Sequence, residues 1–294
     1  MAEASLDRDS GREPGPDGFL LIDKPAGMTS HDAVDRIRRA LGTRKVGHGG
    51  TLDPLATGLL VVGIGRATRL LRFLADLPKT YEGSGVLGVE TTTLDAEGQV
   101  TRRSKVEVSD EGLRTAMERF VGEIEQVPPA YSAVKVGGRK LYQAARQGKT
   151  IEAPPRKVRV ETLDLVLFDG LRFDFRVRCS SGTYVRSLVA DVGRDLGCGA
   201  HLVALRRTGI GPFSVEGAAP PDSPGSPLPL EQAVAHLDSI DLTEEEARAA
   251  THGSILGPAG IEGPYRVVGP DGILIGIYAD QGAKAVPEVI LSPA

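Results

Sequence analysis

Residues 47–58 hold the side chains best suited to chemistry. They combine the carboxylate of Asp53 and the imidazole of His48 with four glycines, and an apolar run, residues 59–62, follows directly. Glycine adopts backbone angles that other residues avoid and lets a ligand approach the chain closely. A carboxylate in such a loop, beside a buried strand, is placed to act on a molecule held in a cleft. The plainer alternative is a tight turn that Asp53 merely caps.

Five further segments accompany this loop along the chain. They are residues 19–30 (FLLIDKPAGMTS), 79–81 (KTY), 131–142 (YSAVKVGGRKLY), 179–186 (CSSGTYVR) and 201–207 (HLVALRR). Together with residues 47–58, and in this order, they resemble the TruB family of tRNA pseudouridine synthases over roughly residues 18–215. Several ordered segments are a far more specific signal than one short motif.

The resemblance implies an isomerase that converts uridine to pseudouridine at position 55, in the T-loop of tRNA. This reaction breaks an N-glycosidic bond, turns the base and rejoins it through carbon. It needs neither a redox partner nor a group donor, so we expect no cofactor. It does need a carboxylate that adds to the sugar or to the base, and the family's residue for this nucleophile is Asp53.

By the same resemblance, four residues would surround the target base. Arg186 would keep Asp53 ionised and oriented, because a buried carboxylate is costly unless it is paired. Tyr81 would stack on the uracil, Tyr184 would form a pocket wall, and Leu205 would close the apolar side. By residue type alone each has a simpler interpretation, namely a surface arginine at a helix start, or aromatic and aliphatic core packing.

The target uridine lies inside a folded RNA loop, so the enzyme has to flip it out of the stack. His48 is the family's candidate for filling the gap that the flipped base leaves. No second ligand stands at helical spacing from His48, so we expect no metal site. The partner is then the tRNA T-stem-loop, recognised by shape. Its phosphates would be contacted by a basic segment that contains Arg139, Lys140, Arg146 and Lys149.

The composition, with 40% hydrophobic and 25% charged residues, is ordinary for a globular protein. No apolar run approaches the length that spans a bilayer, and the first residues lack the apolar core of a signal peptide. The two cysteines, Cys179 and Cys198, are too few for a zinc site and too far apart for a paired redox motif. We therefore expect a cytoplasmic monomer with no membrane partner.

The net charge of −4 conceals an uneven distribution. Residues 130–210 hold 15 Lys and Arg against 7 Asp and Glu, whereas residues 211–294 hold 3 against 12. A basic middle segment is typical of focused phosphate contact, although any single arginine there more often solvates a strand face. The acidic final part is poorly suited to gripping RNA phosphates.

Hydrophobic periodicity and capping residues indicate the elements that position these side chains. Because most neighbouring strands pair as hairpins, we expect an α+β fold with a large, mainly antiparallel sheet flanked by helices. The resemblance makes this a pseudouridine synthase catalytic domain. The predicted strands cover 19–23, 59–64, 157–168, 171–179 and 201–207, with a hairpin over 79–108, and the predicted helices cover 30–41, 66–74, 109–122 and 184–196.

Composition also suggests four parts of the chain. Residues 1–17 read as a disordered tail, residues 18–218 as the catalytic domain, residues 219–230 as a Pro-rich linker, and residues 231–294 as a small C-terminal domain. Two short helices and three strand-like runs make the last part resemble the family's PUA-like β-domain. The three runs cover 265–268, 273–278 and 286–291.

Two other functions compete with this interpretation. An RNA-binding protein that kept the fold and lost catalysis would not need Asp53, Tyr81 and Arg186 together, because binding alone requires no buried carboxylate. A glycosidase or nucleoside hydrolase would place two carboxylates around one bond, and no second carboxylate stands beside Asp53 within residues 47–58.

Overall fold

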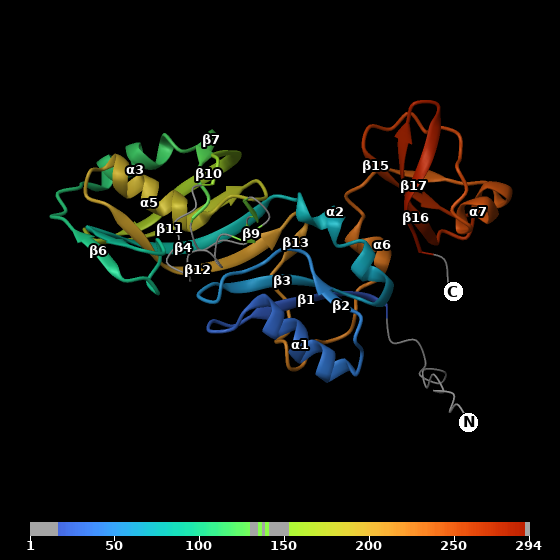
Figure 1. The fold of residues 1–294 in the computed structure, drawn as a ribbon, viewed down its shortest axis with the longest axis horizontal. Coiled ribbons are helices and arrows are strands. Elements are labelled where there is room, and N and C mark those ends of the chain that lie inside the picture. The colour runs from blue at the N-terminus through green and yellow to red at the C-terminus, as the bar shows by residue number, and fades with distance from the viewer. Residues whose placement is uncertain (1–16, 130–134, 137–138, 141–152, 292–294) are drawn as a thin grey trace, which may run out of the picture.

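This computed structural model describes residues 17–129, 135–136, 139–140 and 153–291. A nine-stranded sheet runs in the order β1-β3-β12-β4-β11-β10-β7, with β2 added to β3 and β13 to β12 (Figure 1). Its pairs are antiparallel except β3 with β12, so the expected α+β fold with a large, mainly antiparallel sheet is confirmed. The strands are β1 (Gly18–Lys24), β2 (Val46–His48), β3 (Thr57–Ile64), β4 (Lys79–Leu87), β7 (Gly122–Gln126), β10 (Arg156–Phe168), β11 (Arg172–Cys179), β12 (Ala200–Ile210) and β13 (Phe213–Ser214).

Three helices cover this sheet. Figure 1 shows α3 (Asp110–Glu118) and α5 (Val185–Asp195) together over the β10–β11 part, and α1 (Ser30–Leu41) beside β1 and β3. Each helix buries one apolar stripe, as an amphipathic surface helix does. Under α3 and α5 lies one core cluster, which includes Leu52 and Tyr81, and under α1 lies a second one. The loop over residues 47–58 contributes Leu52 and Ala56 to the first cluster, and Val46 just before it belongs to the second.

The start of α1 fixes the position of that loop. Thr29 caps α1 in a capping box with Asp32, and Gly42 ends the helix at a φ of +63°. Ser30 is buried, and its hydroxyl accepts from the Leu52 amide at 2.8 Å and lies 3.1 Å from the Leu52 carbonyl oxygen. The helix start therefore clamps the residue next to Asp53.

The region over 79–108 differs most from expectation. It is not a single hairpin, because β4 pairs with β11 and β12, both of which lie far along the chain. A separate small hairpin, β5 (Val89–Thr91) with β6 (Val100–Arg103), follows after a turn at Gly88, whose φ is +79°. Alternating apolar residues identify a strand but not its partner, so one hairpin over 79–108 was wrong, although the expected turn at residues 95–98 does connect β5 and β6.

Smaller differences concern helix ends. The predicted helix over 66–74 is two short pieces, η1 (Gly65–Arg69) and α2 (Arg72–Ala75). The helix after Ser109 ends at Glu118, and Gly122, at a φ of +108°, starts β7 instead of stopping that helix. Neither β7 nor β2 was predicted. The β10–β11 hairpin, α1 and α5 are confirmed.

The C-terminal part forms a four-stranded sheet in the order β14-β15-β16-β17. The predicted pair of helices and three strands are confirmed, and β14 adds a short fourth strand. The elements are α6 (Leu230–Ala233), β14 (Ser239–Asp241), α7 (Glu244–Thr251), β15 (Pro264–Val268), β16 (Leu274–Gln281) and β17 (Lys284–Ile290).

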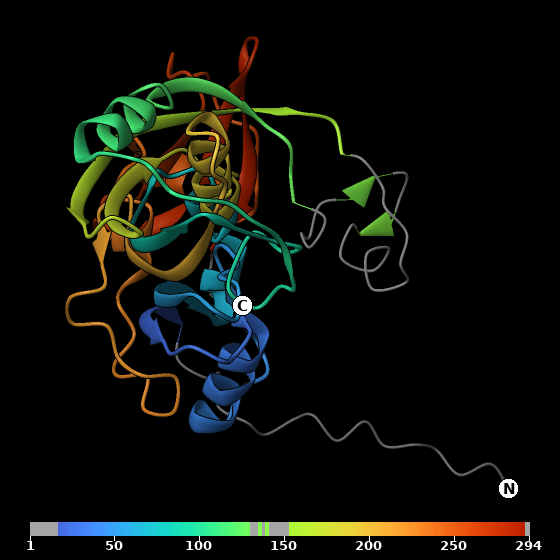
Figure 2. The same cartoon turned by 90° about the vertical axis from the view of Figure 1, so that its left-hand side faces the viewer.

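This sheet packs against η1 and α2 of the larger body. One apolar cluster contains Leu70 and Leu74 together with Ile277 and Leu291 of the C-terminal part. The expected linker is not free: it pairs with β1 through backbone hydrogen bonds at residues 219 and 228. Figure 2 shows β8 (Lys135–Val136) and β9 (Arg139–Lys140) standing apart from the main sheet.

Two further expectations concern the N-terminal tail and membrane-spanning segments. Residues 1–16 of the expected tail lie outside the described part of the chain, whereas Asp17 is described and accepts from the Arg66 backbone. Across the ranges that the structure describes, no helix is long and apolar enough to cross a membrane.

Candidate active site

Asp53 lies in a tight turn between β2 and β3. The Ala56 amide donates to the Asp53 carbonyl at 3.0 Å, and the neighbours Leu52 and Ala56 are buried in the core. The Asp53 side chain itself is 45% exposed. The turn therefore has a rigid base and presents its carboxylate at the surface of a packed body, as a reacting group requires.

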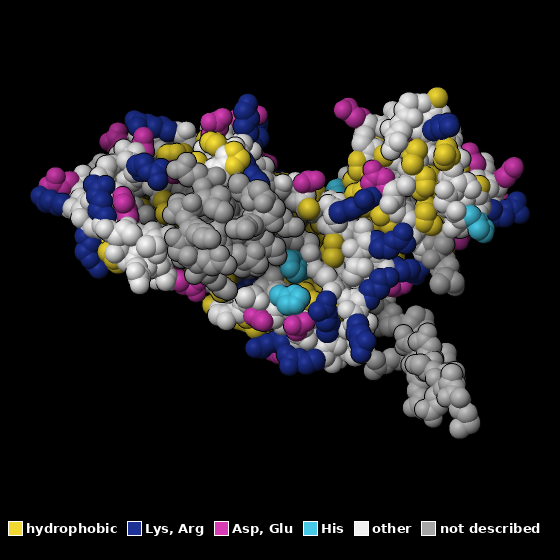
Figure 3. Space-filling view, viewed as in Figure 1, with side chains coloured by type: hydrophobic (Ala, Val, Ile, Leu, Met, Phe, Trp, Pro, Cys, Tyr) yellow, Lys and Arg dark blue, Asp and Glu magenta, His cyan; other side chains and the backbone are white. Residues whose placement is uncertain are grey.

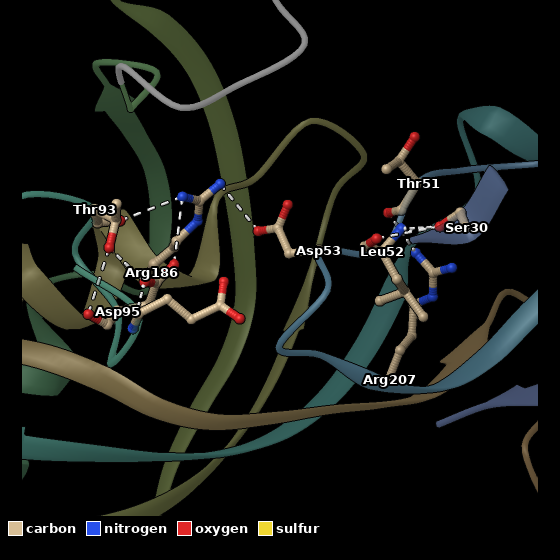
Figure 4. A network of polar contacts seen from close by, with 9 residues as sticks. Ser30, Thr51, Leu52, Asp53, Thr93, Asp95, Arg186 and Arg207 are labelled. Carbon is tan, nitrogen blue, oxygen red and sulfur yellow. Dashed lines mark hydrogen bonds and ion pairs between the residues drawn. The ribbon is translucent and has the colours of Figure 1, made fainter. Parts of the chain in front are cut away.

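Arg186, in the first turn of α5, faces Asp53 (Figure 4). Its Nη2 lies 3.0 Å from Asp53 Oδ2, and its Nη1 lies 3.5 Å from Asp95 Oδ2 and donates to the Thr93 carbonyl at 3.2 Å. The Arg186 side chain is only 6% exposed. One buried guanidinium thus links the exposed carboxylate of Asp53 to the buried carboxylate of Asp95.

Opposing effects act on the Asp53 carboxyl, and its pKa is raised overall because burial is the largest of them. Burial raises the pKa of the Asp53 carboxyl, Arg186 lowers it, and the charge of Asp95 raises it again. The sequence-based expectation that Arg186 stands beside Asp53 therefore agrees with the structure. Its role in keeping Asp53 ionised is supported by the sign of its effect on that pKa.

Asp95 was missed as a site residue, because its sequence, Asp-Ala-Glu-Gly, is typical of an ordinary turn. Its Oδ1 accepts from the Thr93 hydroxyl at 2.5 Å and from the Glu97 amide at 3.1 Å, which leaves Oδ2 facing Arg186. The preceding Leu94 has a φ of +63°, an unusual backbone conformation for a branched residue. Such conformations cluster at functional sites, but no sequence pattern reveals them.

Tyr81 and Leu205 lie on adjacent strands behind the loop. Tyr81 on β4 is the register partner of Arg207 on β12, and Leu205 is that of Gly83. Tyr81 is 9% exposed and shares its core cluster with Leu52, against which Leu205 also packs. Burial raises the pKa of the Tyr81 hydroxyl, and Arg207 counteracts this effect. Both residues are thus brought to the Asp53 loop.

Tyr184 precedes Arg186 by two residues and occupies the N-cap position of α5. Its side chain offers no cap; instead its backbone is held by Gln126, whose Oε1 accepts from the Tyr184 amide at 3.0 Å and whose Nε2 donates to its carbonyl at 3.3 Å. Gln126 is 1% exposed and was not singled out in the sequence. It fixes the start of the helix that carries Arg186.

His48 ends β2, two residues before the Gly50 position of the loop. It pairs with Val62 of β3 and is half-buried. Burial lowers the pKa of its imidazole, and the nearby Arg207 lowers it further, which favours the neutral ring. A neutral, half-buried ring at the edge of the loop suits contact with stacked bases.

Lys24, at the end of β1, holds a turn that contacts the Asp53 loop. It is fully buried, and its ammonium donates to the carbonyls of Pro25 and Met28 at 3.0 and 2.8 Å. Burial lowers its pKa to about 8, while the carboxylate of Asp53 acts in the opposite direction. The bonds to both carbonyls hold the turn after β1, whose Gly27 amide donates to the Pro54 carbonyl next to Asp53.

The expected phosphate contacts are only partly placed. Arg139 and Lys140 form β9, whereas Arg146 and Lys149 lie outside the described residues. Figure 3 shows Lys and Arg side chains gathered on the face between α1 and the C-terminal sheet. Within the described ranges, no three His, Cys, Asp or Glu side chains are grouped so that they could hold a metal ion.

Three known protein families match this chain. Residues 38–185 match the family "TruB family pseudouridylate synthase (N terminal domain)", residues 186–219 match "tRNA pseudouridylate synthase B C-terminal domain", and residues 237–292 match "tRNA Pseudouridine synthase II, C terminal".

Individual relatives cover nearly the whole chain. The tRNA pseudouridine synthase B of Mycobacterium sp. strain KMS is 46% identical over 94% of this chain and 97% of its own length, and that of Thermobifida fusca is 46% identical over 94% and 99%. A solved Cbf5-Nop10-Gar1 complex contains a chain that is 28% identical, with a TM-score of 0.71, over 98% of this chain and 91% of its own. The chain is a tRNA pseudouridine synthase, an isomerase, and it belongs to the TruB family.

Proposed function

We propose that this enzyme isomerises uridine 55 in the T-loop of tRNA, with Asp53 as the nucleophile. One observation carries the proposal: a half-exposed carboxylate on a rigid turn is paired at 3.0 Å with a buried guanidinium, that of Arg186. An ordinary surface pair leaves both side chains partly exposed, as Arg38 and Asp35 do at 35% and 48%, whereas here only the carboxylate is exposed. A carboxylate that has to reach a substrate needs both the exposure and the cation.

The chemistry follows from the fact that uridine and pseudouridine are isomers. The ionised Asp53 adds to the sugar or to the base, the bond between N1 and C1′ breaks, and the base turns so that C5 bonds to C1′. The bond between Asp53 and the substrate then breaks, which returns the carboxylate. The proton lost from C5 is balanced by the proton gained at N1, so no cofactor takes part. Arg186 stabilises the carboxylate whenever it is released from the substrate.

The remaining residues would bind the flipped base. Tyr81 stacks on the uracil, Tyr184 and Leu205 form the pocket wall, and His48 occupies the gap in the RNA stack. Flipping costs a few kcal/mol, which stacking in the pocket and a side chain in the gap offset. The neutral state of His48 supports this role, because an apolar-faced ring replaces a base more readily than a charged one.

The domains, the RNA partner and the cellular location are proposed on the same basis. We propose residues 18–218 as the catalytic domain and residues 231–294 as a PUA-like C-terminal domain, joined by residues 219–230. The enzyme would bind the T-stem-loop of tRNA and would act as a monomer in the cytoplasm. The phosphates of the RNA would be held by Arg139, Lys140, Arg146 and Lys149.

The test is conversion of an unmodified tRNA transcript by purified protein without any cofactor, mapped by mass spectrometry. We expect pseudouridine at position 55 with the natural enzyme and none with Asp53→Asn, which should still bind the transcript. Asp35→Asn is the matched control, because Asp35 is 48% exposed and pairs with Arg38 at 2.9 Å, much as Asp53 pairs with Arg186. Turnover by Asp53→Asn close to that of the control would refute the nucleophile. Tight binding without conversion by the natural enzyme would instead favour an RNA-binding protein.

A further inference from the structure

One buried cation has no part in the function described so far. Arg207, on β12, is 1% exposed and is among the largest side chains that the fold encloses fully. Its neighbour Arg206 points to the other face of the sheet, where a bidentate pair with Asp23, at 3.0 and 2.7 Å, leaves it 40% exposed. Two adjacent arginines of one motif are thus used in opposite ways.

The guanidinium of Arg207 grips both stems of the loop that carries Asp53. Its Nη2 donates to the Gly50 carbonyl at 3.2 Å and its Nη1 to the Thr51 carbonyl at 3.4 Å, on the entry side, while its Nε donates to the Leu59 carbonyl at 2.7 Å, on the exit side. Figure 4 shows Arg207 beneath Thr51 and Leu52. Within the described residues, Arg207 forms no salt bridge with a carboxylate, and its hydrogen bonds go to these three carbonyls. Because its donors bond to three backbone carbonyls, the guanidinium fixes the position of the loop and does not neutralise a carboxylate.

The loop also closes on the Arg207 backbone. Gly58 is the register partner of Arg207 in the parallel pair of β3 and β12, and its φ is +98°. A Cβ at Gly58 would lie 2.3 Å from the Arg207 carbonyl oxygen, so no other residue fits there. The glycines of the loop are therefore needed, at least here, for close approach to Arg207.

On its other side Arg207 meets Tyr81. The two are direct register partners on adjacent antiparallel strands, so their side chains stand on one face of the sheet. The positive charge of Arg207 counteracts the rise in the pKa of the Tyr81 hydroxyl that burial causes. Asp53 stands in the loop before β3 and Tyr81 on β4, and Arg207 bonds to the loop of the one and is the direct cross-strand neighbour of the other.

We infer that Arg207 is a positioning residue that sets the distance between Asp53 and Tyr81 across the flipped base. The inference rests on the proposed function, since it assumes that these two side chains act on opposite sides of the same uracil. Lysine cannot replace arginine in this role, because one ammonium on a flexible stem cannot reach three carbonyls in a fixed plane. A displacement of about 1 Å at a reacting group costs about 10²-fold in rate.

The experiment measures the single-turnover rate constant for uridine 55 and, separately, the Kd of the T-stem-loop RNA. We expect Arg207→Lys to lower the rate constant by about 10²-fold with a Kd within about threefold of the natural enzyme. Arg206→Lys is the matched control and should change neither by more than about threefold. Thermal melting of each variant, well above the assay temperature, confirms that it is folded.

A double-mutant cycle with Tyr81→Phe provides a readout that a purely structural role would not affect. If Arg207 acts through Tyr81, the rate losses of Tyr81→Phe and Arg207→Lys combine to less than their product. Losses that multiply, or a rate constant for Arg207→Lys like that of Arg206→Lys, would overturn the inference. So would a loss that appears wholly in Kd.

Folding defects are also decisive. If Arg207→Lys does not fold, Arg207→Gln, which keeps one donor group without the charge, is measured in its place. Failure of both variants to fold would mean that Arg207 contributes to stability alone. The natural enzyme and Asp53→Asn are measured in parallel. An inactive natural enzyme contradicts the proposed function, whereas an active one beside an unaffected Arg207→Lys contradicts only the role of Arg207.

Discussion

The catalytic end of the main sheet and the C-terminal sheet both bury polar side chains, but of different kinds. Around Asp53 they include three cations, Arg186, Arg207 and Lys24, which are 5%, 1% and 0% exposed, beside the buried carboxylate of Asp95 and the phenol of Tyr81. In the C-terminal sheet they are neutral phenols, Tyr265 and Tyr278, both 0% exposed. Burying a cation costs far more free energy than burying a phenol. The catalytic end is therefore the region where the fold gives up stability.

The two regions also satisfy their buried groups differently. The Tyr265 hydroxyl donates to Asp280 at 2.7 Å and the Tyr278 hydroxyl to the Ser254 carbonyl at 3.0 Å, so both bonds end within the C-terminal part. Arg186 instead reaches Asp53, whose carboxylate remains open to an incoming molecule. Asp280 is also a partly exposed carboxylate, so the two regions differ in the buried partner, which is a guanidinium beside Asp53 and a neutral phenol beside Asp280.

The largest effect is expected from Arg186→Met, which removes the cation from between two carboxylates. We expect the single-turnover rate constant to fall by about 10³-fold, and the free energy of unfolding to fall by about 3 kcal/mol, because Asp95 would remain buried without its partner. Rapid-quench conversion of the tRNA transcript and urea unfolding measure the two. Arg194→Met, on the same helix but 72% exposed and paired with Asp191, should cost less than about 1 kcal/mol. Equal losses in the two variants would remove the contrast between buried and exposed pairs.

A smaller effect with a defined sign is expected from Asp95→Asn. Because the charge of Asp95 raises the pKa of Asp53, its removal lowers that pKa. Because the proposed reaction needs ionised Asp53, the acid limb of the pH–rate profile should move to lower pH. At the plateau we expect about tenfold slower turnover, because Arg186 loses an orienting partner. A limb that moves to higher pH would show that Asp95 does not act on Asp53 through charge.

These two residues also show how far the sequence alone reaches. Thr29 and Gly42 predicted the ends of α1 correctly, because capping is encoded within a few residues. The place of Arg186 beside Asp53 came from the family resemblance and not from spacing, since 133 positions separate them in the chain. Asp95 and Gln126 were missed for a related reason: each acts on a partner far along the chain, and a turn residue or a strand end carries no local sign of it. The wrong hairpin over 79–108 has the same cause.

In the C-terminal sheet the matching change is Tyr265→Phe. It removes a hydrogen bond to a carboxylate, but Asp280 keeps the amides of Ala259 and Gly260, at 3.1 and 2.7 Å, as donors. We expect a loss of about 1–2 kcal/mol in the free energy of unfolding and an unchanged rate constant. Urea unfolding and the transcript assay measure these. A rate loss comparable to that of Asp95→Asn would mean that the C-terminal sheet contributes to the chemistry.

The smallest effect is expected where the two regions meet. Arg72 pairs with Glu288 of β17 at 2.6 Å, but the two side chains are 53% and 33% exposed. Exposed pairs contribute less than about 1 kcal/mol, and salt screens them. Arg72→Ala should therefore lower the free energy of unfolding by less than about 1 kcal/mol. In 1 M salt, where the Debye length is about 3 Å, the substitution should make no difference to that free energy. Leu70→Ala, in the shared apolar cluster beneath, should cost about 2–5 kcal/mol. If the order of these two losses were reversed, the C-terminal sheet would be held by charge, and the contrast between the two regions would have to be drawn differently.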